Sequence, residues 1–435
     1  MLIGSSFLVA LAWLLAIPVI VLLIETVAAI FLPQRRIDFA SGNAGRPRVA
    51  VIVPAHNESN GILRTLGDIK KQLTPGDRLL VIADNCDDDT AAIALAEGAE
   101  VIERNEPQKT GKGYALDFGF KHLDLDPPAV VISIDADCRI KEGTIDRLAK
   151  ACQIEQRPIQ ALDLMTAPAL SPINYRVAEF AWRIKNWVRP LGLGALMLPC
   201  HLMGTGMAFP WGLIRSNIVA SGSIVEDVKL SLELAEAGRP ALFYPQAVVT
   251  SQFPQSAEGV RSQRKRWEKG SIGLIGTMVP RLIWKGITTK NFGLVALALD
   301  SLVPPLSLLA ILVVGLFFVT GTAALIGMPH TAFYISIACI MALFLSAALS
   351  WMKYGRDLLP LKSIPSVGSY VLEKLPLYRE IFSERTDPTW VRADRHGIST
   401  VPKRDTPIAP SGPTTPSTLS STTVTPATPK RSNDP

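Results

Sequence analysis

The chain has 435 residues, enough for more than one domain, and a net charge of +6. At 48% hydrophobic residues and a mean hydropathy of +0.26 it is more apolar than a typical soluble protein, and it lacks the arginine-rich helices or aromatic–basic strand pairs that bind nucleic acid. Its five cysteines form no Cys-x-x-Cys or Cys/His cluster, which argues against a zinc site and a disulfide framework.

Three apolar blocks predict membrane spans. The first runs from Phe7 to Leu32, longer than the roughly 20 residues that cross the hydrocarbon layer. No basic residue precedes it, whereas Arg35 and Arg36 follow it, which indicates an uncleaved anchor rather than a signal peptide. The others are about Phe292 to Thr320 and about Thr331 to Trp351.

The charges that flank these blocks predict the orientation of the chain. The loop Gly321–His330 has no Lys or Arg, whereas Lys353 and Arg356 follow the last block. By the positive-inside rule the central region and the C-terminal tail face the cytoplasm of a multi-pass plasma-membrane protein. The acids Glu25 and Asp300 lie near the cytoplasmic ends of their spans, and we expect them to be hydrated at the interface.

Five regions are predicted along the chain. They are an N-terminal anchor (1–33), a cytosolic α/β domain (46–290), two transmembrane helices (292–351) that Pro304-Pro305 should bend near the start, an interfacial amphipathic segment (352–398) and a disordered tail rich in Pro, Thr and Ser (399–435).

The central region alternates short β-branched runs with helical patterns. This order predicts βαβ units and a mostly parallel sheet. The expected strands are Val49–Val53, Leu79–Ala83, Val101–Glu103, Val130–Ile134 and Ile159–Met165.

Polar residues directly after these strands are the first candidates for a site, because open α/β sheets bind ligands at the carboxyl ends of their strands. Pro54-Ala55-His56-Asn57-Glu58 follows the first strand, although a turn and a helix cap would also explain it. Asp84 follows the second strand and suits a base or a ribose. Asp135 and Asp137 follow the fourth and can turn toward one divalent cation.

Several common nucleotide-binding motifs are absent. Lys112-Gly113 could approach a phosphate but does not fit the phosphate loop of nucleoside triphosphatases. Gly204-Thr205-Gly206 lacks the third glycine of a dinucleotide fingerprint. Cys138 and Arg139 follow Asp137, where a phosphotransferase Asp-x-Asp motif would continue with Thr or Val.

Two later motifs combine charge with a possible role in catalysis. Glu226-Asp227 opens a predicted helix, where acids also serve simply as partners of the helix dipole. Gln263, Arg266 and Trp267 lie on a basic helix ahead of the next span, which could be a juxtamembrane patch. Arg266 beside Trp267 would also suit a leaving diphosphate and a sugar ring.

Taken in order, these motifs over residues 48 to 270 resemble the membrane-embedded glycosyltransferases of family 2, which include cellulose, hyaluronan and poly-N-acetylglucosamine synthases. The resemblance implies a GT-A-type nucleotide-diphospho-sugar transferase fold and an inverting, single-displacement transfer from a UDP-sugar. A polysaccharide or a lipid-linked molecule would be the acceptor, in exopolysaccharide or cell-envelope glycan synthesis at the lipid bilayer.

The resemblance also implies roles for individual residues. Pro54, Ala55, Asn57, Glu58 and Asp84 would hold the uridine, Lys112 would lie near the nucleotide, and Asp135 and Asp137 would face the ribose and an Mg²⁺ or Mn²⁺ ion, Asp137 foremost as metal ligand. Asp227, beside Glu226, would be the catalytic base. Gln263, Arg266 and Trp267 would contact the acceptor and the diphosphate.

Two departures from the family pattern matter. Val225 stands where a Thr usually precedes the Glu-Asp pair. Three spans are also fewer than polymer-secreting synthases use, so export would need self-association or another glycan-assembly membrane protein. A catalytically silent, nucleotide-sugar-binding scaffold is the alternative function, and a transporter is disfavoured because paired hydropathy repeats are missing.

Overall fold

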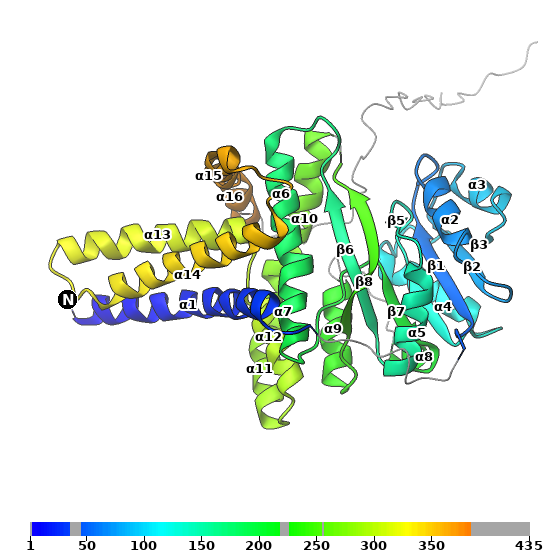
Figure 1. The fold of residues 1–435 in the computed structure, drawn as a ribbon, viewed down its shortest axis with the longest axis horizontal. Helices are drawn as coiled ribbons and strands as arrows, with labels where there is room; N and C mark the ends of the chain where they lie inside the picture. The colour runs from blue at the N-terminus through cyan, green and yellow to red at the C-terminus, as the bar shows by residue number, and fades with distance from the viewer. Residues whose placement is uncertain (1, 35–44, 218–225, 255, 384–435) are drawn as a thin grey trace, which may run out of the picture. The chain divides into compact units, whose positions relative to one another are not determined.

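The computed structural model describes residues 2–34, 45–217, 226–254 and 256–383. The expectations for Arg35, Arg36, Val225 and the tail 399–435 lie outside these residues. Within them the central region is an α/β domain, and α1, α13 and α14 extend from one side of it (Figure 1).

An eight-stranded sheet forms the centre of the described part of the domain, in the order β3-β2-β1-β4-β7-β6-β8-β5. Four consecutive strands in that order are parallel. Their bounds are β1 Val49–Ala55, β2 Arg78–Asp84, β3 Glu100–Arg104 and β4 Val130–Ser133. Their carboxyl ends therefore share one edge of the sheet.

The other half of the sheet is mixed. β6 (Ile159–Thr166) and β8 (Leu242–Gln252) are parallel to each other, whereas β7 (Met207–Pro210) is antiparallel to both β4 and β6, and β5 (Arg139–Ile140) is antiparallel to β8. β6 and β8 thus run in the same direction as the first four strands. The predicted mostly parallel sheet is confirmed, and the short strands β5 and β7 add its antiparallel part.

Both faces of the sheet are buried, because side chains alternate along β1. Val49, Val51 and Val53 point into one core, and Ala50 and Ile52 into the other. The first core is covered by α2 (Ile62–Lys70), α3 (Thr90–Ala96) and α5 (Thr144–Glu155), and the second by α4 (Lys112–Leu123), α8 (Trp211–Asn217) and α9 (Glu226–Glu236).

Helix α4 packs unusually close to the sheet at Gly119. A Cβ atom at this position would lie 2.4 Å from Ile52 Cδ1 and 2.8 Å from Ile82 Cδ1. Glycine therefore sets the distance between α4 and the strands, and with it the position of Lys112 at the start of α4.

A continuous helical segment joins the sheet to the apolar helices. It comprises α6 (Ile173–Arg183), a π-helical turn η1 (Ile184–Val188) and α7 (Arg189–Ala195). Helix α10 (Ala257–Thr277) and α11 (Val279–Thr288) follow the sheet, and η2 (Leu361–Ser363), α15 (Ile364–Glu373) and α16 (Leu375–Ser383) follow the last span.

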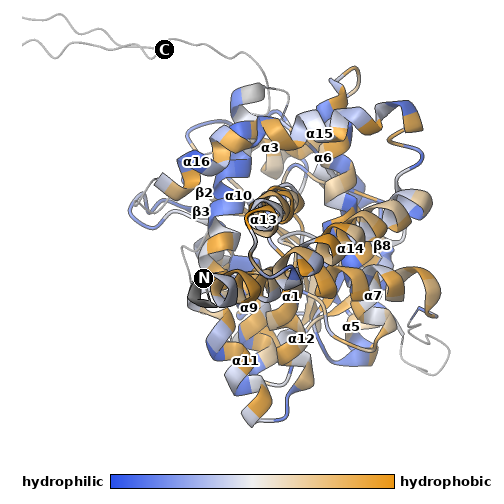
Figure 2. Ribbon diagram, turned by 90° about the vertical axis from the view of Figure 1, so that its left-hand side faces the viewer, coloured by the Kyte–Doolittle hydropathy of each residue, from blue (hydrophilic) through white to orange (hydrophobic). Residues whose placement is uncertain are grey.

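Three described helices are long and apolar enough to cross a membrane. The spanning segments are Gly4–Phe31 in α1 (Leu2–Phe31), Leu306–Leu325 as α13 and Thr331–Tyr354 as α14. Helix α1 packs along α14, and α13 packs beside α14. Figure 2 shows the largely hydrophobic colouring of these helices.

The second span begins later than the sequence predicted. Residues Phe292–Ser301 form a separate helix, α12, and the chain turns at Pro304-Pro305 before α13 begins. Leu294, Leu297 and Ala298 of α12 are buried against α9 and α11 rather than left for lipid. The prolines therefore separate two helices instead of bending one.

The expected hydration of Glu25 and Asp300 is wrong. Glu25 is 2% exposed and Asp300 is 7% exposed, and both bind Arg189 at the start of α7. An acid in an apolar helix is stabilised here by a buried cation that approaches from a distant part of the chain.

Candidate active site

A cavity of about 350 Å³ opens at the carboxyl ends of β1, β2 and β4. It is closed from the other side by α9, α10 and the junction of α7 with α12. Twelve of the site residues predicted from the sequence line it, namely Pro54, Ala55, Glu58, Asp84, Lys112, Asp135, Asp137, Glu226, Asp227, Gln263, Arg266 and Trp267.

Asp84 is held at the base of this cavity by a buried ion pair. Arg104 Nη1 donates a hydrogen bond to Asp84 Oδ1 at 2.5 Å, and Asn85 Nδ2 donates to the same oxygen at 3.0 Å. Burial raises the pKa of Asp84, while Arg104 acts in the opposite direction. The fixed carboxylate leaves an oriented acceptor facing the cavity, as a base or ribose would require.

Asn57 is the one predicted donor-site residue that does not line the cavity. Its backbone is left-handed, with φ at 56°, and its side-chain oxygen accepts a hydrogen bond from the Asp87 N–H at 2.9 Å. The side chain thus joins the loops after β1 and β2. Neighbouring His56 does line the cavity, and its Nδ1 lies 2.7 Å from Asp84 O.

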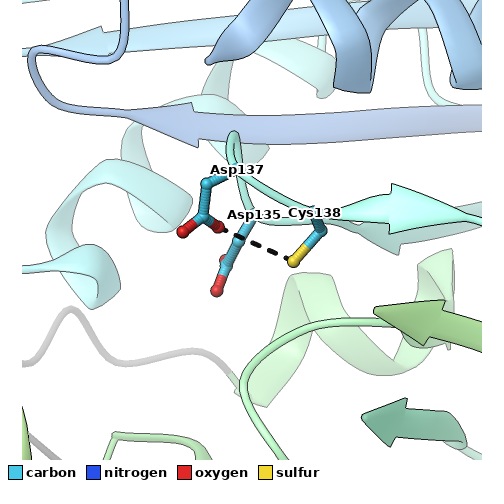
Figure 3. Close-up of side chains that lie close together, drawn as sticks. All are labelled: Asp135, Asp137 and Cys138. Carbon is cyan, nitrogen blue, oxygen red and sulfur yellow. Dashed lines mark hydrogen bonds between the residues drawn. The ribbon is translucent and has the colours of Figure 1, made fainter. Parts of the chain in front are cut away.

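Asp135, Asp137 and Cys138 lie together on the loop after β4 (Figure 3), with one ligand atom from each within 4.8 Å of the others. Burial raises the pKa of the Cys138 thiol well above its ordinary value, so the thiol stays protonated and donates to Asp137 Oδ1 at 3.7 Å. The ligands offered are therefore two carboxylates, which suit Mg²⁺ or Mn²⁺ rather than a soft metal.

Lys112 connects this loop to the turn that contains Gly204. Its Nζ donates to Asp135 Oδ1 and, at 2.7 Å, to Gly204 O. Gly204 has a φ of +89°, and a Cβ there would lie 3.5 Å from Asp227 Oδ2. The positive φ favours glycine at this position, whereas the space beside the Asp227 carboxylate would admit a Cβ.

Glu226 and Asp227 begin α9 and face the cavity. The Val228 N–H donates to Asp227 Oδ1 at 2.8 Å. Burial, together with the neighbouring Asp227, raises the pKa of Glu226 to about 8, and burial also raises the pKa of Asp227. Two adjacent half-buried carboxyls that resist joint ionisation are typical of a site that handles protons.

Helix α10 supplies Gln263, Arg266 and Trp267. Gln263 is only 2% exposed, and its Nε2 has no hydrogen-bond partner among the described residues. Burial lowers the pKa of Arg266, while Glu226 favours its charge. Trp267 lies 5.3 Å from Trp182 between ring centroids, so the two rings form an aromatic wall.

The sequence did not reveal the residues that η1, α7 and the loop between α7 and β7 bring to the cavity. Lys185, Asn186, Arg189 and His201 all line it, together with Asp300 of α12. A π-helical turn often marks a functional position, but it has no sequence signature of its own. In the sequence, Glu25 and Asp300 were the signal that could have pointed to Arg189, because an acid in an apolar segment requires a cationic partner.

Asp163 on β6 is a further buried acid near this wall. Asn186 Nδ2 donates to Asp163 Oδ2 at 2.9 Å. Burial raises the pKa of Asp163 to about 7, and the neighbouring Asp135 adds to the rise. Asp163 thereby fixes the π-helical turn against the sheet.

This sheet topology and this edge site define the GT-A class of nucleotide-diphospho-sugar transferases. The chain belongs to the family described as glycosyltransferase like family 2, whose profile matches residues 47–270, just over half of the chain. The predicted family and fold class are therefore confirmed.

Related proteins agree with this assignment. The chain is 27% identical to the probable glycosyltransferase YdaM of Bacillus subtilis over 248 residues, which cover 52% of this chain and 55% of YdaM. It is 32% identical over 110 residues to the uncharacterized protein MJ1222 of Methanocaldococcus jannaschii, covering 25% of this chain and 44% of that protein. The chain thus matches only about half of the length of either relative.

A solved structure shares the fold over most of the chain. The mannosyltransferase PcManGT of Pyrobaculum calidifontis, in complex with GDP-Man and Mn²⁺, superposes with a TM-score of 0.54 at 17% identity. The likeness covers 87% of this chain and all of that one.

Proposed function

We propose that this protein is a membrane-bound inverting glycosyltransferase that transfers a sugar from a UDP-sugar to a polysaccharide or lipid-linked acceptor, in exopolysaccharide or cell-envelope glycan synthesis. The observation that carries the proposal is the convergence of Asp84, Asp137, Asp227 and Arg266 on one cavity. These residues come from two strand ends and two helices, and together they supply what a sugar transfer requires.

The donor would bind along the strand edge, with its base and ribose against Asp84 and its diphosphate toward the β4 loop. Asp135 and Asp137 would hold a divalent cation, with Asp137 first because Lys112 already binds Asp135. Once bound, such a cation acts as a Lewis acid on the diphosphate. The complex of PcManGT with GDP-Man and Mn²⁺ supports a nucleotide sugar and a divalent metal.

In the transfer itself, the acceptor hydroxyl oxygen forms a bond to the anomeric carbon as the bond from that carbon to the diphosphate oxygen breaks. Asp227 takes the hydroxyl proton, the nucleoside diphosphate leaves with the bonding electrons, and the anomeric configuration inverts. Arg266 stabilises the charge on the departing diphosphate. A sugar ring of the acceptor can stack on the Trp182–Trp267 wall.

The candidate spans and the basic residues after α14 support placement of the catalytic domain on the cytoplasmic face of the plasma membrane. Nucleotide sugars would then reach the strand edge from the cytosol. The acceptor would approach from the side of α7, α12 and α13.

Membranes that contain the full chain, incubated with a panel of UDP-sugars, test this function. Donor-dependent UDP release is expected, and Asp227→Asn should lower it about 10²–10⁴-fold because the base is lost. Asp117→Asn is the matched control, because that carboxylate pairs with Lys121 on the surface of α4. UDP binding without turnover would instead support a silent scaffold, and retained turnover in Asp227→Asn would overturn the role of Asp227.

A further inference from the structure

A second cavity of about 160 Å³ adjoins the catalytic cavity on the membrane side. The two share six lining residues: Trp182, Lys185, Arg189, Trp267, Ser271 and Val303. The Trp182–Trp267 wall therefore stands at the boundary between them. A molecule in the second cavity can reach toward Asp227 past these two rings.

The charges around the second cavity are strongly unbalanced. Four cationic side chains line it, Lys185, Arg189, Arg264 and Lys374, against the single acid Glu268. Arg189 is neutralised by Glu25 and Asp300, and Lys374 by Glu268 at 2.5 Å. The remaining positive charge belongs to Lys185 and Arg264.

Neither of these two cations pairs with a carboxylate in the described part of the chain. Lys185 contacts the Trp182 ring, with Nζ 5.2 Å from its centroid, and Arg264 lies over the Phe253 and Tyr370 rings at 5.8 and 5.5 Å. Lys185 is exposed and lines both cavities, so its ammonium group can meet a ligand in either one. Asp227, Asp163 and Asp300 attract it through space, and an anion in direct contact would stabilise its charge further.

The opposite wall of the second cavity belongs to the membrane-proximal part of the protein. Pro304, Pro305 and Leu306 line it where α13 begins, and Tyr370 closes it from α15. Leu372 of α15 and Phe382 of α16 are each 64% exposed, although both helices are amphipathic in sequence. Exposed apolar side chains beside a span suit the interfacial region of a bilayer.

We propose that the second cavity binds the phosphate of a lipid-linked acceptor, with Lys185 and Arg264 as its ligands and the lipid chain leaving between α13 and α15. This inference rests on the proposed function and narrows its acceptor to an anionic lipid. The phosphate would lie at the boundary between the cavities, and the part of the head group that receives the sugar would extend past Trp182 and Trp267 toward Asp227. A neutral polysaccharide would bring no anion into contact with either cation.

The test uses the purified full chain in nanodiscs, titrated with a long-chain polyprenyl phosphate, the polyprenol of equal length, inorganic phosphate or a neutral oligosaccharide. Native mass spectrometry reports the bound lipid, and UDP binding is measured on the same preparation. We expect the lipid phosphate to bind about 10–100-fold more tightly than the alcohol, since each contact is a hydrogen bond to a charged group.

Lys185→Met and Arg264→Gln should each weaken binding of the lipid phosphate about tenfold or more while affecting the alcohol less. Lys362→Met is the matched control, because this exposed lysine of η2 lines neither cavity and should change nothing. Equal affinity for phosphate and alcohol, equal binding of inorganic phosphate, or tighter binding of the oligosaccharide would each overturn the inference. Loss of UDP binding and of transfer in the wild-type chain would instead refute the proposed function.

Discussion

Arg189 offers the sharpest test of how the first span is tied to the catalytic domain. Its guanidinium donates to Glu25 Oε2 at 3.0 Å, to Asp300 Oδ1 at 2.5 Å and to Asp300 O at 2.6 Å. Arg189→Met would remove all three bonds and leave two buried carboxylates close together. Breaking a buried pair in this way costs about 3–5 kcal/mol. At about 1 °C per kcal/mol for a chain of this length, the expected fall in Tm is roughly 3–6 °C.

Thermal unfolding of the full chain in detergent, followed by intrinsic fluorescence, measures this effect. Arg176→Met is the matched control, because Arg176 is an exposed residue of α6 and its loss should change stability by no more than about 0.5 kcal/mol. Adding Glu25→Gln to Arg189→Met should recover part of the lost stability, because one uncompensated charge disappears. A Tm shift equal to that of the control, or strict additivity in the double variant, would refute this account of the network.

Three further outcomes follow from the site and the core. Glu226→Gln should leave the acidic limb of the kcat/KM profile, where activity is lost as pH falls and Asp227 is protonated, at the same pH, because Glu226, with its pKa raised to about 8, carries no charge in that range. A limb that moves to lower pH would show that Glu226 is ionised there. Asp137→Ala should reduce transfer about a hundredfold or more and make the remainder insensitive to a chelator, whereas metal-dependent turnover in this variant would place the cation elsewhere. Gly119→Ala should be less stable than Gly67→Ala by about 1–3 kcal/mol in denaturant unfolding, because only the added Cβ at position 119 lies close to core side chains. Equal stability of the two variants would show that Ile52 and Ile82 move aside without cost.

Much of the strand edge of the cavity could be predicted because it depends on local order. Asp84 and Asp137 each follow a buried strand, and parallel strands bring their carboxyl ends to one edge without any knowledge of distant packing. The start of α9 and the α10 motif became candidates for a different reason, namely their charge pattern and the resemblance to the family. Asn57 shows the limit of the reasoning from strand ends. It lies in the predicted loop after β1, but its side chain binds the loop after β2 instead of lining the cavity.

The helical side of the cavity depends on contacts between distant parts of the chain. Lys185 lies 42 residues before Asp227 in the sequence, on a π-helical turn without a pattern of its own. The separation of α12 from α13 is equally non-local, because an apolar helix of 10 residues is buried by α9 and α11 rather than by lipid. Hydropathy measures apolar character and cannot distinguish these two environments.

The closest helix contact in the described chain has a practical consequence. A Cβ on Gly192 of α7 would lie 2.0 Å from Glu25 O of α1, so the two backbones meet without an intervening side chain. The first helix thereby supports α7, whose residues line the cavity. Trimming it to obtain a water-soluble enzyme would strip Arg189 of a counter-ion and leave α7 without this support, so enzymology on this protein calls for the whole chain in a lipid or detergent environment.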